Sequence, residues 1–135
     1  LDHACNANLP AKLQPRAGSC LAARALKTAG IVGGEDKAFE MAWWLIDNGP
    51  SLGSMSEVDI ITQASDLGMD PSAFATTLNS AGVDRLIKQD VDEFKRNRFP
   101  HLPVVIVDDR QIPRLSLQNE SVIGAVLEEA TSGSN

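Results

Sequence analysis

The chain has 135 residues, which suits one domain, and 43% of them are hydrophobic, which is enough for a core. It carries 18 acidic and 12 basic residues, and no basic cluster is longer than Lys95-Arg96-Asn97-Arg98, so binding to nucleic acid is not expected. No apolar stretch approaches the roughly 20 residues of a membrane span, and no signal peptide is evident. We therefore expect no membrane span.

Residues 1–15 are predicted to be an irregular lead-in, because their asparagines and prolines disfavour regular structure. This segment holds Cys5, and the second cysteine of the chain is Cys20. The two are either buried thiols or a structural disulfide, and we favour the disulfide, which would contribute about 3 kcal/mol. A bridge would imply an oxidising compartment. Two cysteines with His3 are too few ligands for a typical zinc site, so no metal is expected.

Residues 16–98 are predicted to form a helical domain. A first helix ends at Gly30, and a second runs from Glu35 to about Asn48 after the break at Gly33-Gly34. In the second helix Phe39, Trp43 and Ile46 recur at i, i+4 and i+7, which predicts a core stripe. Met41 and Trp44 widen the apolar surface. Deeper burial is favoured over an exposed patch for a partner.

Three further helices are expected in this domain. The third starts at Ser54 or Ser56, where Ser54-Met55-Ser56-Glu57 has capping-box spacing, and ends at Leu67-Gly68. Asp70 caps the fourth, with Pro71 in its first turn. The fifth follows Gly82 and runs to about Arg98, so the basic cluster occupies a last turn, where cations suit the helix dipole.

Residues 99–130 are predicted to hold a β-hairpin and a final helix, followed by a frayed tail at 131–135. The run Val104–Val107 predicts a strand buried on both faces. A polar turn at 108–111 leads to Ile112–Leu115, a returning strand that Pro113 confines to a sheet edge. Ser116 or Asn119 would cap the final helix.

The predicted hairpin leaves one edge of a buried strand without a neighbour. Unpaired buried backbone groups are costly, and an open apolar edge invites another strand. We expect strands upstream of Leu1, a complementing segment or a second copy of the chain to complete the sheet. The chain opens at Leu1 without a methionine, so an upstream segment is expected.

The order of several short segments resembles a known family. They are Leu1-Asp2 with Cys5–Leu9, Ser19–Ala25, Gly33–Phe39 through Trp43–Leu45, and Leu102-Pro103 followed by Val104–Val107. Together they resemble the DsbA-like thiol–disulfide oxidoreductases of the thioredoxin superfamily, in a subgroup often found beside vitamin K epoxide reductase-like proteins. The resemblance covers nearly the whole chain. It implies an α/β fold, mostly α here: an incomplete thioredoxin-like fold with a helical insertion and one C-terminal β-hairpin followed by a helix.

The resemblance also implies an activity. Members of this family use a low-pKa thiolate that exchanges with a protein thiol or disulfide substrate, without a cofactor, in an extracytoplasmic (periplasmic or secreted) compartment. This chain contains no Cys-x-x-Cys, because Cys5 and Cys20 are too far apart. It looks like the C-terminal part of such a domain, and whether the chain is itself an enzyme stays open.

Leu102 and Pro103 match the position of the family's cis-proline loop, which lies against the redox site and binds extended substrate. Without the resemblance, Pro103 would be assigned an ordinary trans bond at a strand start, and Pro100 competes for the same role. His101 would either tune a nearby thiol or be an exposed loop residue.

The alternative function is a redox-inactive thioredoxin-like binding module, with the Trp43-Trp44 helix and the open strand edge as interaction surfaces. A hydrolase is disfavoured because neither histidine lies near a G-x-S-x-G motif.

Overall fold

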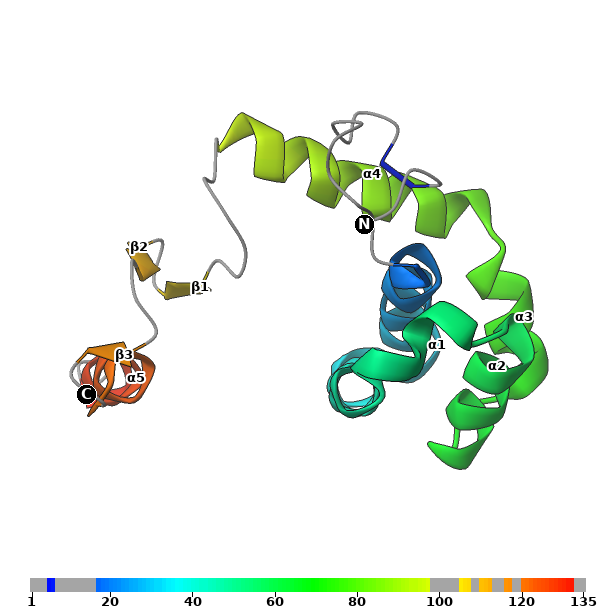
Figure 1. Cartoon of the computed structure of the whole chain (residues 1–135), viewed down its shortest axis with the longest axis horizontal. Coiled ribbons are helices and arrows are strands. Elements are labelled where there is room, and N and C mark those ends of the chain that lie inside the picture. Colours follow the sequence, from blue (N-terminus) through cyan, green and yellow to red (C-terminus); the bar gives the residue numbers. More distant parts are fainter. Residues whose placement is uncertain are drawn as a thin grey trace. The chain divides into compact units, whose positions relative to one another are not determined.

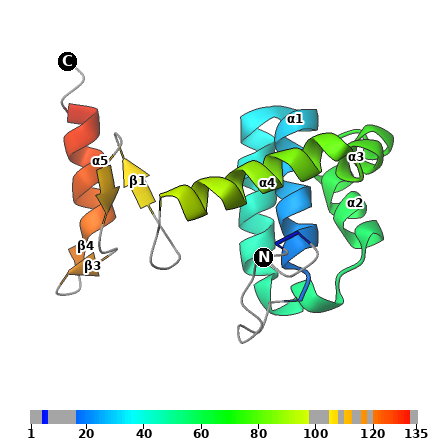
Figure 2. The ribbon, with the colours of Figure 1, turned by 90° about the horizontal axis from the view of Figure 1, so that it is seen from above.

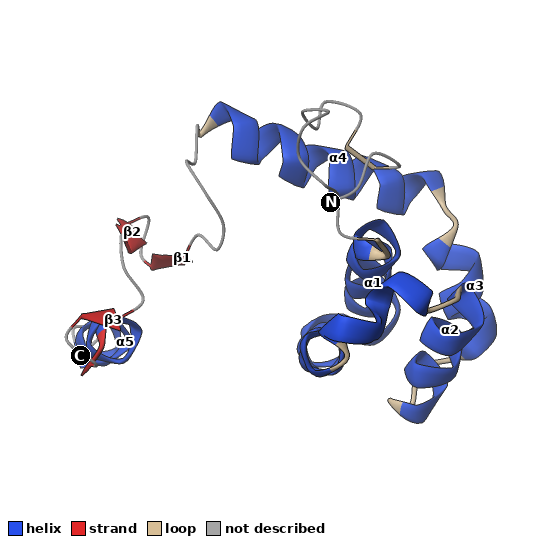
Figure 3. Cartoon of the chain, in the orientation of Figure 1, coloured by secondary structure: helices blue, strands red, loops and turns tan. Residues whose placement is uncertain are grey.

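The computed structural model describes residues 5–6, 17–97, 105–107, 110–112, 116–117 and 120–132. These residues are mostly helical, as the sequence predicted (Figure 3). The chain divides into two compact units, Leu1–Glu93 and Phe94–Asn135. The division lies within helix α4 (Ala81–Arg96).

Helix α1 (Ser19–Asp47) is a helical hairpin formed by the first two predicted helices. Gly34 breaks it with φ 83° and ψ −175°, a conformation that essentially only glycine adopts. The two helices are therefore separated by the single non-helical residue Gly34 and not by the longer loop that was expected. The two halves lie side by side (Figure 2), and a Cβ added at Gly30 would lie 3.7 Å from the Ala38 Cβ.

Side-chain caps start the next helices. A 3₁₀ helix, η1 (Gly49–Ser54), leads into α2 (Glu57–Asp66). The capping box of α2 is formed by Ser56 and Asp59, so the prediction that placed it on Ser54–Glu57 was wrong in register. The Ser56 backbone N–H donates to the Asp59 carboxylate at 2.8 Å, and this bond lowers the pKa of Asp59. Asp70 caps α3 (Pro71–Leu78) as predicted, accepting the Ala73 N–H at 2.6 Å.

The core of the first unit lies between α1, α2 and α3 (Figure 1). Its buried residues are Ala25, Ala29, Met41, Leu45, Ile60, Ala64, Met69, Phe74 and Leu78. Ala25 and Ala29 give the first half of α1 a small-residue face that permits close packing, and Phe74 fills the centre with no exposed surface.

The predicted core stripe of the second half of α1 was wrong. Phe39, Trp43 and Ile46 are 60%, 66% and 65% exposed, whereas Met41 and Leu45 are buried. This half-helix is apolar around most of its circumference, so periodicity alone does not determine which side is buried. The packing of the hairpin against α2 and α3 selects the Met41 side.

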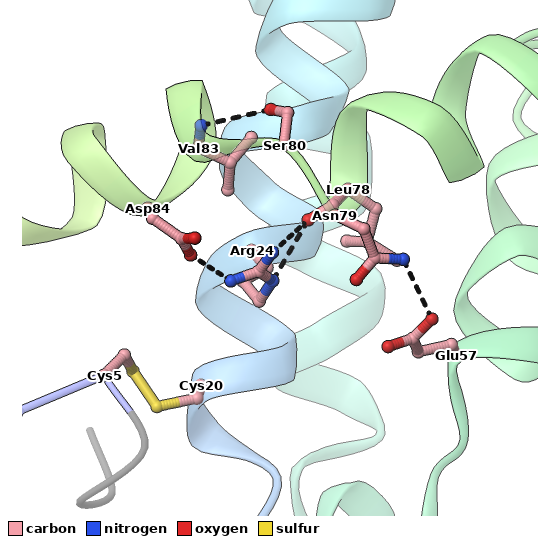
Figure 4. Close-up of polar contacts among 9 residues, drawn as sticks. All are labelled: Cys5, Cys20, Arg24, Glu57, Leu78, Asn79, Ser80, Val83 and Asp84. Atoms are coloured by element: carbon pink, nitrogen blue, oxygen red, sulfur yellow. Dashed lines mark hydrogen bonds and ion pairs between the residues drawn. A yellow bond between two sulfur atoms is a disulfide. The ribbon is translucent and has the colours of Figure 1, made fainter.

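Arg24 connects three helices of the first unit (Figure 4). Its Nε and Nη2 atoms donate to the Leu78 carbonyl oxygen at 3.0 and 2.7 Å, and its Nη1 atom donates to the Asp84 carboxylate. The Leu78 carbonyl belongs to the last turn of α3, where helix carbonyls lack intrahelical partners. Arg24 therefore satisfies the end of α3 and joins it to α1 and α4.

Replacing Arg24 with methionine is expected to lower the free energy of unfolding by about 2 kcal/mol, because the carbonyl of the buried Leu78 loses two charge-assisted bonds. Lys27→Met is the matched control. Among the described residues, Lys27 forms an ion pair with the exposed Asp90 carboxylate at 2.7 Å, and such pairs contribute about 0–1 kcal/mol. Urea unfolding of both variants gives the comparison, and equal losses would contradict the role assigned to Arg24.

The second unit contains two short hairpins and a helix. Strand β1 (Val105–Val107) pairs antiparallel with β2 (Arg110–Ile112), with Val105 opposite Ile112. Strand β3 (Ser116–Leu117) pairs with β4 (Glu120–Ser121), and α5 (Val122–Ser132) contacts β1 and β3.

Several predictions for this unit need correction. The returning strand starts at Arg110, two residues earlier than predicted, so the last two residues of the predicted turn belong to the strand. Ser116 belongs to a strand and caps no helix, and the final helix continues through Ser132, into the predicted tail. Ile106 is 52% exposed, so β1 is not buried on both faces. The β-branched run indicated a strand correctly, but the Ile106 side of that strand is exposed.

Candidate functional site

The predicted substrate-binding loop falls outside the described residues. This applies to His101, Leu102 and Pro103, and also to Pro100. The nearest described element is β1, which starts at Val105 and has β2 on one edge. The role of this loop therefore stays a prediction.

Cys5 and Cys20 are joined by a disulfide, one of the two states that the sequence left open (Figure 4). Their Cα atoms lie 5.8 Å apart, a usual separation for a bridged pair. Cys20 is in the first turn of α1 and is buried, so the bridge fastens Cys5 to the start of the bundle. The position is that of a structural link.

An exposed apolar surface lies on the second half of α1. We call it the Trp43 face and define it as Phe39, Trp43 and Ile46. All three side chains are at least 60% exposed. Their i, i+4, i+7 spacing places them along one ridge of the helix. Two aromatic residues and an isoleucine together on a surface are unusual for a solvated helix and typical of a contact site.

Carboxylates border the Trp43 face. Glu35 and Asp36 precede Phe39 by one turn, and Asp47 follows Trp43 by one turn, so these side chains neighbour the ridge. We call these three residues the acidic rim. All three are exposed, and no salt bridge to another described residue neutralises them. Sequence reasoning missed this rim, although the spacing of the acids around the stripe would have revealed it.

Other features of the described residues offer less chemistry. A shallow groove of about 350 Å³ is lined mainly by apolar atoms of α2, with Pro71 of α3 at its border. In the ranges that the structure describes, no three histidine, cysteine, aspartate or glutamate side chains gather closely enough to hold a metal ion. None of the described helices combines the length and apolarity needed to cross a bilayer.

Among the described residues, the Trp43 face is the strongest candidate for a binding surface. Both cysteine sulfurs are consumed by the bridge, and the Trp43 face offers apolar area with a negatively charged border. No family model matches the sequence, and no curated protein or solved structure matches it either.

Proposed function

We propose that the chain is part of an extracytoplasmic, DsbA-like thiol–disulfide oxidoreductase whose Cys-x-x-Cys is contributed from outside these residues. The supporting observation is the order of elements, a helical bundle followed by antiparallel hairpins and then a helix, although the resemblance implies one hairpin and the structure has a second, β3–β4. The sequence resemblance depends on this order. The Cys5–Cys20 disulfide adds support, because such bridges persist in oxidising compartments.

The reaction would be thiol–disulfide exchange. A thiolate of the Cys-x-x-Cys pair attacks one sulfur of a substrate disulfide, a mixed disulfide forms, and the other substrate sulfur leaves as a thiolate. The second cysteine then attacks the mixed disulfide, which releases the substrate as a dithiol and leaves the pair oxidised. Leu102 and Pro103 would border this site and hold the substrate in an extended conformation. The chain's own bridge is structural and takes no part in the exchange.

Insulin reduction by the longest natural form of the protein tests this proposal. Pro103→Ala in that form is expected to lower the rate at least about tenfold, because a small displacement of a substrate-positioning group has effects of this size. Pro100→Ala is the matched control and is expected to leave the rate nearly unchanged. The chain alone is expected to be inactive, since it has no Cys-x-x-Cys.

Two results would contradict the proposal. One is a longest natural form that lacks a Cys-x-x-Cys and does not reduce insulin. The other is an active form in which Pro100→Ala is damaging and Pro103→Ala is not, which would move the substrate site to Pro100.

A redox-inactive binding module is the second candidate function. The observation that favours it is the exposure of Phe39, Trp43 and Ile46, which a purely structural insertion does not require. An inactive longest form that binds a protein partner saturably would support this candidate instead.

A further inference from the structure

The second half of α1 has one side packed in the core and the opposite side exposed. Met41 is fully buried and Leu45 is 8% exposed, and both pack in the core. The opposite side carries the Trp43 face, which no described residue of the first unit covers. The helix is therefore held in place by its buried side, and the Trp43 face is presented on a supported backbone. A preorganised face loses little conformational entropy when a partner binds.

The acidic rim restricts what can occupy this face. A second copy docked through the same face would bring two sets of unpaired carboxylates together, which costs energy unless counterions intervene. An anionic lipid surface would be repelled for the same reason, and the net charge of −6 adds to this repulsion. A partner that places lysine or arginine beside an apolar stripe would satisfy both parts of the surface.

We propose that the Trp43 face and its acidic rim bind a cationic amphipathic helix of a partner polypeptide. The exposed ridge extends over two helical turns, a length of about 10 Å, which matches the contact that two crossing helices make. Trp43 is the expected anchor, because tryptophan dominates the binding energy of many interfaces. The lysines or arginines of the partner would pair with Glu35, Asp36 and Asp47. This inference concerns a different surface from the proposed redox site and does not depend on it.

The probe for this proposal is a synthetic peptide of about 18 residues, a length at which a helix begins to be stable, made of leucine and lysine at helical spacing. A peptide with glutamate in place of every lysine is its control. Fluorescence anisotropy of the labelled peptides, titrated with the whole chain, is expected to give a dissociation constant on the order of 10 µM for the lysine peptide, since the contact is small. The glutamate peptide is not expected to bind.

Paired variants separate the two parts of the surface. Trp43→Ser is expected to weaken binding of the lysine peptide at least about tenfold, whereas Val58→Ser, at a residue that is 70% exposed on α2, should leave it unchanged. Asp36→Asn with Asp47→Asn should weaken binding and reduce its dependence on salt. Glu128→Gln with Glu129→Gln removes the same charge from α5 and should have no such effect.

Circular dichroism and urea unfolding verify that each variant is folded, which is expected because all the replaced side chains are exposed. Three results would overturn the proposal. The glutamate peptide could bind as tightly as the lysine peptide, or the control variants could weaken binding as much as the test variants. The third result is a dimer of the unmodified chain in sedimentation that Trp43→Ser dissociates. A second copy of the chain would then be the occupant of the Trp43 face. The insulin-reduction assay tests the proposed redox function separately, and its result does not depend on any of these three outcomes.

Discussion

Replacement of Gly18 with alanine is expected to lower the free energy of unfolding by about 3 kcal/mol. Gly18 is the N-cap of α1 and has φ 77°, a left-handed conformation that costs an L-residue about 1–2 kcal/mol. A Cβ at this position would also lie only 1.9 Å from the Leu52 carbonyl oxygen. Because that atom belongs to the backbone of η1, no side-chain rotation relieves the clash, and overpacking adds about 1–3 kcal/mol.

Gly68→Ala separates the two contributions. Gly68 has nearly the same φ, 82°, but a Cβ there would meet nothing within 4 Å. Its expected loss is therefore the backbone cost alone, about 1 kcal/mol. Urea unfolding of both variants measures the difference. Equal losses would mean that η1 moves away from α1 at little cost, and that the close contact at Gly18 does not stabilise the bundle.

The local signals of the helices were predictable from the sequence. Asp70 with Pro71 fixed the start of α3, and the glycines around residue 34 indicated the break in α1. Such features depend on the chemistry of neighbouring residues, so a short stretch of sequence is enough to determine them. The strand at Val105–Val107 was predictable for a similar reason, since β-branched side chains favour extended backbone.

The burial of α1 was not predictable in the same way. Phe39 and Trp43 are more hydrophobic than Ala25 and Ala29, yet the alanines are fully buried and the aromatic residues are exposed. Tertiary packing favours small side chains where two helices approach closely, and hydrophobicity does not report that distance. The Arg24 contacts with Leu78 and Asp84 join residues more than 50 positions apart, and no local pattern indicates them.

The candidate sites also combine features that the local sequence indicates with features that only the packing determines. The alternative of an exposed patch around Trp43 was open from the sequence, but the choice between burial and exposure needed the position of the core. The Cys5–Cys20 disulfide was favoured over two buried thiols from the sequence, and the structure contains the bridge. The acidic rim became recognisable only when the Trp43 face was known to be exposed, because charges beside a buried stripe would be ordinary solvated residues.

Loss of the disulfide is expected to destabilise the first unit about as much as Gly18→Ala. The bridge closes a loop between residues 15 positions apart, and in the chain-entropy account a loop of this size contributes about 3 kcal/mol. The variant is Cys5→Ser with Cys20→Ala, because Cys5 is half-buried and Cys20 is buried beside apolar neighbours. Its urea midpoint should fall relative to that of the oxidised chain.

A reducing agent supplies the matched control. Dithiothreitol should lower the urea midpoint of the unmodified chain towards that of the double variant and leave the variant unchanged, because only the former has a bond to lose. If the reduced chain unfolds at the same urea concentration as the oxidised chain, the bridge does not constrain the unfolded state. The structural role assigned to Cys5–Cys20 would then be lost.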